Sequence, residues 1–556
     1  MLLAIIPRCS CFFVHHQTVI KRTNKLSLSC ATDSALDDLQ SKEAAADDEQ
    51  GKIGLYVHIP YCRRRCSYCN FAIVPIGSKV KTEAKRESEE DAATQGFFDM
   101  DYDYRTSILQ EIYLLREQQE HKKSPIILQS VYFGGGTPSL APLETIRSIL
   151  QAVLSPTNDH ESPLFTLASD AEISIEMDPG TFSLSKLQTL HEMGFNRVSL
   201  GVQSFDDNIL ELIGRVHRRN DVYEAIAMID TVFGRKNNTN NNDDQRGINY
   251  SIDLISGLPG LSLAKWTETL ATAVSLKPRP CHISLYDLQI EQGTVFGRRY
   301  SGRNEEAMDQ GGALLPSQDT RGAVPVTASS VERDVLPSEI ESAFMYKYAA
   351  GYLRAKGYEH YEVSSYAYVD ELNSGKEKQR RNNQIADNNR KRNRSRHNQI
   401  YWDVDGQWYA VGLGGTSFVN GTLTARPRAL ADYRGWVQDQ AQGRVKENGK
   451  MDKDDILTDV ILKRLRTADG LDLQWVEQNF GKDCVQKILS GADLGLELGL
   501  MTLDNNKGSD IAIASPEILR LVDPDGFLYS NNLISNIFVE LGEEYYCSDD
   551  DDDNDD

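Results

Sequence analysis

The sequence is poor in long apolar runs and in cysteines, and its acidic residues outnumber its basic ones. After the opening residues, no segment reaches the roughly 18 uncharged apolar residues that a membrane-spanning helix needs, so we expect none. The nine cysteines among 556 residues are an odd number at low density, which excludes the disulfide framework of small secreted proteins. The formal net charge of −22 argues against nucleic acid as the main partner.

The two ends of the chain have biased compositions. Residues 1–32 contain no Asp or Glu and include several Ser and Thr, which is typical of an organelle transit peptide. The basic residues of this stretch are Arg8, Lys21, Arg22 and Lys25. The apolar opening MLLAIIP also fits a secretory or bipartite plastid signal, although Arg8 interrupts it. We therefore predict an organelle, either mitochondrion or chloroplast, with the cytoplasm as the alternative.

The length allows two or three domains of about 150 residues each, and 40% hydrophobic residues suffice for real cores. Three internal segments are polar, rich in Asn, Gly or Ser, and typical of surface insertions. We predict a transit peptide and leader at 1–50, a barrel at 51–300 with insertions at about 79–99 and 235–245, a low-complexity insertion at 301–337, an extension at 338–450, a winged-helix-like domain at 451–545 and an acidic tail at 546–556.

Six strand-like runs alternate with helical spacers along the first half of the chain. They are Ile53–Ile59, Leu128–Phe133, Ala171–Met177, Arg197–Val202, Tyr250–Ile255 and His282–Leu288. The spacers include a helix at Tyr104–Glu120 and another after Gly136, with Ser139 as its N-cap. This alternation predicts an α/β fold with a parallel sheet, a partial (β/α)6 TIM-like barrel whose ligands bind at the C-terminal ends of the strands.

From Asp455 onward the pattern becomes mostly helical. Two amphipathic helices precede a hairpin predicted at Leu519–Phe527, whose turn is Pro524-Asp525-Gly526, and a further helix follows. Helices followed by a hairpin indicate a small winged-helix-like domain. Because this segment is acidic, we interpret it as a lid or docking module rather than a DNA-binding unit.

The stretch YVHIPYCRRRCSYCNF places Cys62, Cys66 and Cys69 at the spacing C-x3-C-x2-C, just past a strand. Three thiolates on one loop can hold three irons of a [4Fe–4S] cluster, which usually takes four, and so leave one iron for a ligand that is not protein. The alternative is an incomplete zinc site. A structural zinc site needs four ligands, and the next cysteine downstream is Cys281.

Polar residues and glycines recur at the predicted strand ends. Gly135, Gly136 and Thr137 belong to FGGGTP, where main-chain N–H groups can approach a ligand. The later strand ends supply Glu176, Gln203, Arg215 and Asp253. Together they can hold the ribose, carboxylate and amine of a nucleoside-like ligand. Each of them, taken alone, also fits an ordinary turn or strand end.

These motifs, with GVQSFD, GRVH, DLISGLPG, SLYDLQIE and YEVSSYA, resemble the oxygen-independent coproporphyrinogen III oxidase family of radical S-adenosylmethionine (SAM) proteins. The resemblance spans roughly Lys52 to Leu541, apart from the insertions. It implies that SAM binds the open iron of the cluster. It further implies that the SAM contacts are Tyr56, Gly135, Gly136, Thr137, Glu176, Gln203, Arg215 and Asp253.

Two features of the sequence resemble the HemW branch of that family. The oxidases carry a further cysteine two positions after the third cluster ligand, where this chain has Phe71. The segment RHNQIYW matches the H-N-x-x-Y-W motif of HemW, and its His397 is the candidate heme ligand. A neutral imidazole is a good axial ligand for heme iron, and Tyr401 and Trp402 could pack on a porphyrin. The alternative is a structural histidine beside a buried tryptophan.

The resemblance therefore implies a heme chaperone that binds a [4Fe–4S] cluster, SAM and heme. Its implied partners are recipient hemoproteins, an electron donor such as a ferredoxin or flavodoxin, and a peripheral membrane contact. The alternative is a coproporphyrinogen dehydrogenase that converts coproporphyrinogen III to protoporphyrinogen IX. A third class is a nucleic-acid-modifying radical SAM enzyme that would use the winged helix. Separately, the basic run at 376–396 suggests an RNA contact, but it lacks the interleaved aromatic residues typical of one.

Overall fold

A computed structural model describes residues 52–82, 92–118, 124–156, 162–234, 249–300, 335–369, 393–445, 449–505 and 517–542. The predicted leader, the acidic tail and most of the predicted insertions lie outside these ranges. In the described part of the chain, no helix combines the length and apolarity that crossing a membrane requires.

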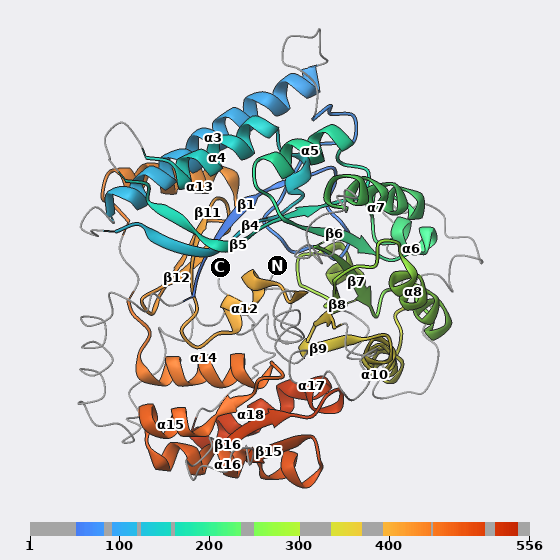
Figure 1. The fold of residues 1–556 in the computed structure, drawn as a ribbon, viewed down its shortest axis with the longest axis vertical. Helices are drawn as coiled ribbons and strands as arrows, with labels where there is room; N and C mark the ends of the chain where they lie inside the picture. The colour runs from blue at the N-terminus through green and yellow to red at the C-terminus, as the bar shows by residue number, and fades with distance from the viewer. Residues whose placement is uncertain are drawn as a thin grey trace, which may run out of the picture.

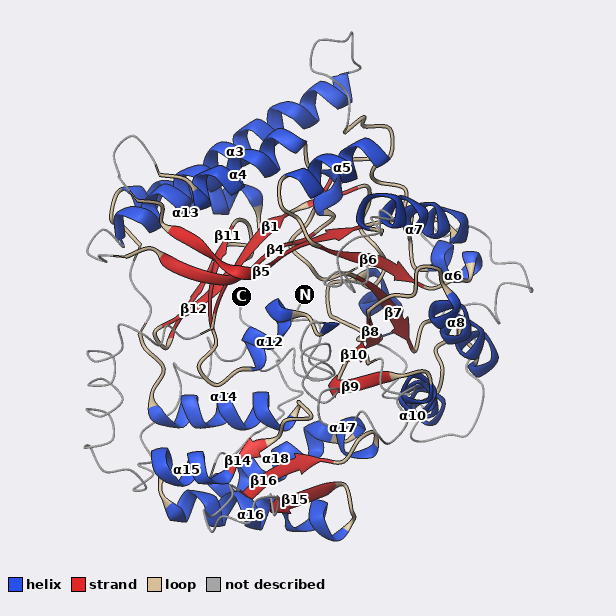
Figure 2. Ribbon diagram, viewed as in Figure 1, coloured by secondary structure: helices blue, strands red, loops and turns tan. Residues whose placement is uncertain are grey.

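The fold is built on one curved sheet of eleven strands, shown in Figures 1 and 2. Six neighbouring strands run parallel in chain order, as the sequence predicts. They are β1 (Ile53–Ile59), β4 (Ile126–Gly135), β5 (Phe165–Met177), β6 (Arg197–Gln203), β7 (Tyr250–Ser256) and β8 (His282–Asp287). The carboxyl ends of these strands consequently meet at one edge of the sheet.

Strands from later in the chain extend the sheet on both sides. Next to β1 lie β11 (Gln407–Val411), β12 (Thr416–Val419) and β13 (Thr422–Ala425), with β11 parallel to β1. Next to β8 lie β10 (Ser365–Tyr368) and β9 (Tyr358–Glu362), both antiparallel to their neighbours. The sheet is thus wider than the six strands expected from the first 300 residues.

Side chains of the parallel strands alternate between two environments, because successive residues of a strand point to opposite faces. One face is apolar: Val57, Phe133 and Ile175 are fully buried against the helices. The other face is polar and aromatic and turns to the concave side. It carries Tyr56, Ser130, Tyr132, Glu172, Glu176, Arg197, Ser199, Asp253, His282 and Ser284.

Helices cover the convex, apolar face of the sheet (Figure 1). They are α3 (Ala92–Gln118), α4 (Leu143–Leu154), α5 (Leu184–Glu192), α6 (Asp207–Leu212), α7 (Arg219–Phe233), α8 (Leu263–Ser275), α10 (Glu339–Ala355) and α13 (Leu430–Ala441). The short helix α9 (Val295–Tyr300) bonds the cysteine loop at Ser67. Short elements beside the first strand are β2 (Tyr61–Cys62), β3 (Val74–Pro75) and the 3-10 turn η2 (Pro138–Leu140).

Two helix starts differ from the predictions. The helix expected at Tyr104 begins at Ala92, because Phe97 packs edge-on against the ring of Tyr61 and belongs to the same buried core. Ser139 does not cap the following helix. It lies within η2, and α4 begins only after Pro142, since proline fits the start of a helix, where no N–H is required.

The C-terminal region has its own apolar core, centred on Leu465, Ile488 and Ile537. Its helices are α14 (Lys453–Leu465), α15 (Leu473–Phe480), α16 (Lys482–Glu497), α17 (Asp525–Leu528) and α18 (Ser530–Leu541). Its antiparallel strands are β14 (Leu471–Asp472), β15 (Met501–Asn505) and β16 (Glu517–Leu521), in the order β14-β16-β15. This arrangement is that of a winged helix.

The hairpin predicted at Leu519–Phe527 is wrong. The hairpin pairs β15 with β16, and Pro524-Asp525-Gly526 instead begins α17, in which Leu528 N–H donates to the carbonyl of Pro524. The cause is Phe527, which is 1% exposed and packs into the C-terminal core.

A buried ionic network joins α3 to the second half of the chain. Glu111 accepts hydrogen bonds from Gly412 N–H at 2.8 Å, Arg426 Nε at 2.7 Å and Tyr433 Oη at 2.6 Å. The side chains of Glu111 and Arg426 are 4% and 2% exposed. Removing one partner of such a pair leaves the other charge buried without compensation.

Glu111→Gln should therefore lower the free energy of unfolding by about 3–5 kcal/mol. Glu144→Gln is the matched control, because Glu144 pairs with Arg105 but its side chain is 74% exposed. The control should cost less than about 1 kcal/mol. Urea unfolding of both variants measures the difference, and equal effects would show that the network does not support the fold.

Candidate functional site

The three cysteines lie on the loop that follows β1, at the C-terminal edge of the parallel strands. Cys62, Cys66 and Cys69 are each partly exposed. The loop docks on neighbouring segments through its backbone. Ser67 N–H donates to the carbonyl of Ile213 at 3.0 Å, and the Ser67 carbonyl accepts from Phe296 N–H at 2.9 Å.

Arginines between the cysteines fix the course of this loop. Arg64 donates to the carbonyl of Gly214 at 2.7 Å and to that of Arg215 at 2.6 Å. Arg65 donates to the carbonyls of Cys69 at 3.3 Å and Phe71 at 2.9 Å, so it holds the loop in a closed curve. The run of three arginines thus serves the geometry of the thiols.

Burial raises the pKa of the Cys62 thiol well above the usual range, and it also raises the pKa of the Cys69 thiol. Iron binding has to displace these protons, because the thiolate is the ligand. Among the described residues, no three His, Cys, Asp or Glu side chains converge on a single metal ion. The three thiolates of a [4Fe–4S] cluster do not share one ion, because each binds its own iron. The absence of a single-ion site among the described residues therefore does not test the cluster, whose assignment remains a prediction from the spacing.

The glycine turn packs tightly against the start of the cysteine loop. A Cβ on Gly136 would lie 2.6 Å from the carbonyl carbon of Pro60. Gly135 has a φ of +112°, a region that favours glycine, and its N–H donates to Glu176 Oε2 at 3.1 Å. Thr137 Oγ1 lies 3.6 Å from Cys62 Sγ. The turn thus joins the thiols to the strand-end carboxylates.

Two carboxylates are buried on the concave face. Glu176 accepts from Tyr132 Oη at 2.8 Å, and Asp253 accepts from Ser199 Oγ at 3.2 Å. Burial raises the pKa of Glu176, and burial together with Glu176 raises that of Asp253 to about 7. Neither carboxylate forms an ion pair within the described part of the chain. Their surroundings favour a cationic ligand, which would stabilise the charged form of both groups.

Arg215 connects the cysteine loop to the next strand ends. Its NH1 lies 3.7 Å from Cys66 Sγ, its NH2 donates to the Gly201 carbonyl at 2.9 Å, and it pairs with Asp178. Asp178 also accepts from Thr137 Oγ1 at 3.2 Å. The sequence analysis did not single out Asp178, although it follows Glu176 by two residues at the same strand end.

Gln203 ends β6 with a φ of +65°, one of two non-glycine residues with positive φ in the described chain. Such a backbone costs about 1 kcal/mol or more and is often found at functional sites. The bend lets the chain turn at once into Ser204-Phe205-Asp206 and the N-cap of α6. The amide of Gln203 therefore stays at the strand-end edge.

His58, which was not among the candidate residues from the sequence, connects Tyr56 to the end of the cysteine loop. His58 Nε2 lies 2.8 Å from the carbonyl of Ala72, so it donates there, and its Nδ1 accepts from Tyr56 Oη at 3.1 Å. Burial lowers the pKa of His58 to about 4, which keeps this neutral tautomer. A period-two reading of β1 would have placed His58 on the same face as Tyr56.

His397 lies in α12 (Arg396–Trp402), which occupies the concave side of the sheet between β4 and α14 (Figure 1). The ring stacks on Tyr132 at a centroid distance of 4.9 Å. Its Nδ1 is 2.8 Å from Ser130 Oγ and its Nε2 is 3.0 Å from Tyr401 Oη. With 1% exposure and both nitrogens hydrogen bonded, His397 has the surroundings of a structural histidine in this conformation.

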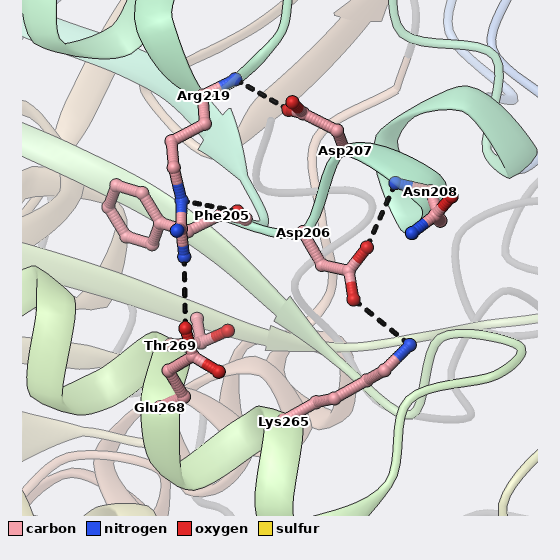
Figure 3. Close-up of a pocket in the computed structure, with 8 residues that line it drawn as sticks. All are labelled: Phe205, Asp206, Asp207, Asn208, Arg219, Lys265, Glu268 and Thr269. Atoms are coloured by element: carbon pink, nitrogen blue, oxygen red, sulfur yellow. Dashed lines mark hydrogen bonds and ion pairs between the residues drawn. The ribbon is translucent and has the colours of Figure 1, made fainter.

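A separate polar pocket lies on the outer rim, between α6, α7 and α8 (Figure 3). Its charged side chains point at one another. Asp206 pairs with Lys265 at 2.9 Å, and Arg219 pairs with Glu268 at 3.2 Å. In these ion pairs the charged groups of the pocket neutralise one another. The pocket is separate from the site at the strand ends.

The chain is similar to several known proteins. A family profile described as "Radical SAM superfamily" matches residues 56–273. The heme chaperone HemW of Synechocystis sp. is 32% identical over 496 residues, which cover 88% of this chain and 97% of that protein. The mitochondrial "Radical S-adenosyl methionine domain-containing protein 1" of Bos taurus is 30% identical over 68% of this chain and 63% of its own length.

A solved structure shares the architecture over almost the whole length. Coproporphyrinogen III oxidase (HemN) from Escherichia coli, a radical SAM enzyme, matches with a TM-score of 0.59 and covers 94% of this chain and 98% of its own. At 18% identity the likeness concerns the fold alone. It confirms the predicted α/β fold.

The raised pKa of Asp253 predicts a pH dependence of the ligand-free protein. A folded-state pKa near 7, against an ordinary value of 3.8, means that the folded state holds a proton that the unfolded state releases. The stability that the protonated Asp253 allows is fully present below about pH 4 and is lost as the pH rises through 7. Asp253→Asn should therefore stabilise the fold at pH 8, by up to about 4 kcal/mol, and have little effect at pH 4.

Unfolding by urea at both pH values measures this effect. Asp432→Asn, at an exposed position of α13, is the control. A gain that is independent of pH would contradict the proposed protonation of Asp253.

Gly136→Ala should disturb the cysteine loop, because the added carbon meets the backbone of Pro60 and Tyr61 rather than a flexible side chain. Overpacking of this kind costs about 1–3 kcal/mol. We expect lower iron and sulfide content per chain after anaerobic reconstitution. Gly351→Ala in α10, where nothing lies within 4 Å of the added carbon, is the control. Full iron content in Gly136→Ala would refute the close contact.

Proposed function

Because the chain belongs to the radical SAM family that contains HemW and HemN, we propose that it is a HemW-like heme chaperone. In this proposal it binds a [4Fe–4S] cluster, SAM and heme, and transfers heme to hemoproteins in an organelle. The observation that carries the proposal is the position of α12. The H-N-x-x-Y-W motif forms this helix, and its His397 and Tyr401 line the concave face that also bears Tyr56 and Glu176.

The strand-end residues suit the cluster and SAM. We assign Cys62, Cys66 and Cys69 as the cluster ligands, and the glycine turn as the part that receives the methionyl end of SAM. The tight approach of Gly136 to Pro60 supports this, because it holds the turn directly against the start of the cysteine loop. When bound, the cluster supplies the electron that this family uses to cleave SAM.

The chain's own residues then have distinct tasks. Glu176 and Asp253 provide the negative charge for the cationic groups of SAM, and burial is the main cause of their raised pKa values. Arg215, held by Asp178 and the Gly201 carbonyl, provides a fixed positive charge beside Cys66. His58 orients the hydroxyl of Tyr56 on the concave face.

The proposed heme ligand is His397 Nε2, after Tyr401 has moved away. Burial lowers the pKa of His397 to about 3, so the imidazole is neutral and keeps one lone pair for iron. Ser130 Oγ holds Nδ1, which would fix the ring orientation in the way that partners of metal-bound histidines do. Tyr401 Oη lies 3.0 Å from Nε2 and engages its lone pair, so the hydroxyl would have to leave before this nitrogen could hold heme.

An organelle location is supported by the mitochondrial names of relatives from Bos taurus and Danio rerio. The acid-free residues 1–32 support the same location. Recipient hemoproteins, a ferredoxin or flavodoxin as electron donor, and a peripheral membrane contact complete the proposal.

Hemin titration tests the heme assignment. His397→Ala should weaken the saturable Soret shift at least about tenfold in Kd, which corresponds to the loss of roughly 1.4 kcal/mol or more. Tyr401→Phe should strengthen it, because the competing hydroxyl is gone while the aromatic ring remains. His282→Ala is the control, since His282 is also fully buried on the concave face but bonds Tyr361.

Three results would contradict the assignment. Equal hemin affinity in all variants would move the ligand elsewhere. Weaker binding in Tyr401→Phe would show that the tyrosine supports heme rather than competing with it. Turnover of coproporphyrinogen III by the reconstituted protein would favour the alternative dehydrogenase.

A further inference from the structure

Exposed or partly exposed arginines surround the cysteine loop. We call Arg64, Arg65, Arg218, Arg298 and Arg428 the arginine collar. The collar stands out because the whole chain has a formal net charge of −22. Four of its members are exposed, and Arg218 is partly exposed.

Shared contacts show that the collar is one surface. Arg64 and Arg218 both donate to the carbonyl of Arg215, at 2.6 and 3.0 Å. Arg65 donates to the carbonyl of Cys69, and Arg428 donates to that of the next residue, Asn70. Arg298 belongs to α9, whose Phe296 N–H bonds the loop at Ser67.

Among the described residues, no acidic side chain neutralises the positive charge of the collar. Every hydrogen bond of the collar described above goes to a backbone carbonyl, and Arg298 likewise donates to the carbonyl of Gly293 at 3.0 Å. None of the five forms an ion pair with a described residue. Arg219, Arg354 and Arg394, by contrast, pair with Glu268, Asp523 and Glu359.

We propose that the arginine collar is the docking surface for an acidic electron-donor protein. The inference rests on the proposed function, because it requires a cluster on the cysteine loop. One electron would leave the reduced centre of the donor and enter the cluster, so the donor is oxidised and the cluster reduced by one electron, with no bond or proton transferred.

Charge is the reason for this choice of partner. The whole chain has 82 acidic and 60 basic residues, so its net charge repels an acidic donor and a local positive patch determines where the donor can approach. The collar guanidiniums are spread around a loop and already bind carbonyls, so they do not converge on one anionic group. Long-range attraction of a protein surface suits this arrangement better than a bidentate phosphate site.

The test uses the full chain with its reconstituted cluster and a reduced acidic plant-type [2Fe–2S] ferredoxin. The variant is Arg298→Glu with Arg428→Glu. The control is Arg279→Glu, because Arg279 is also exposed and donates to a carbonyl, that of Lys356, but lies just before β8, at the opposite edge of the sheet. Stopped-flow absorbance measures the rate of cluster reduction at low and high salt.

We expect the rate constant of the variant to fall about tenfold at low salt, and the difference to shrink at high salt. Iron content and reduction by dithionite show whether each variant still carries its cluster. If Arg428→Glu loses the cluster, Arg298→Glu alone decides the question.

Equal rates for the variant and the Arg279→Glu control would overturn the proposal. The proposal would also be overturned if the variant bound phosphatidylserine vesicles more weakly than the parent but had unchanged ferredoxin kinetics. That result would assign the collar to a membrane. A protein that assembles no cluster fails the proposed function itself. A protein with a cluster, normal hemin binding and ferredoxin kinetics indifferent to the collar fails only this inference.

Discussion

The central constraint of this structure is a parallel sheet with one buried polar face. A polar group that is removed from water without a partner costs free energy, so a face that carries Ser130, Glu176 and Asp253 must be matched by other polar groups. Near the N-terminal ends of the strands the chain supplies them itself. Arg197 pairs with Glu172 at 3.4 Å, and Arg396 N–H at the start of α12 donates to Glu172 at 3.1 Å. Near the C-terminal ends Asp178 pairs with Arg215, but Glu176 and Asp253 form no ion pair with a described residue, and that is where the ligand site is proposed.

The cysteine loop depends on this arrangement but is held by different means. Its flanks, Tyr61 and Ala72, pack into the main core, and arginine–carbonyl hydrogen bonds hold the part of the loop between them. Because carbonyl oxygens satisfy the N–H groups without cancelling the charge, Arg64 and Arg65 order the loop and leave it electropositive. The pairing of arginines with backbone carbonyls therefore explains both the geometry of the loop and the positive charge around it.

The sequence predicted the six parallel strands well, because each is a short β-rich run between helical patterns. Of the candidate site residues expected at strand ends, Glu176 and Gln203 lie there, whereas Asp253 lies within β7 and Arg215 lies between α6 and α7. Thr137 and Arg215 lie close to the cysteine loop. The sequence could not predict contacts between distant segments. The bond between Ser130 and His397 joins residues 267 positions apart, and no local pattern signals it. The start of α3 was missed for the same reason, since Phe97 is ordered by its contact with Tyr61.

The placement of α12 has a consequence for how the two proposed ligands interact. Gly54 of β1 makes room for this helix, since a Cβ there would lie 3.1 Å from Ile400 and 3.2 Å from His397. Tyr401 is close enough to Glu176 that the carboxylate contributes to raising the pKa of the tyrosine. Heme that displaces Tyr401 from His397 would then change the surroundings of Glu176, a proposed SAM contact. Since linkage is reciprocal, SAM bound at Glu176 would shift heme affinity by the same factor. If both proposed ligands bind as described, α12 would therefore couple the two sites.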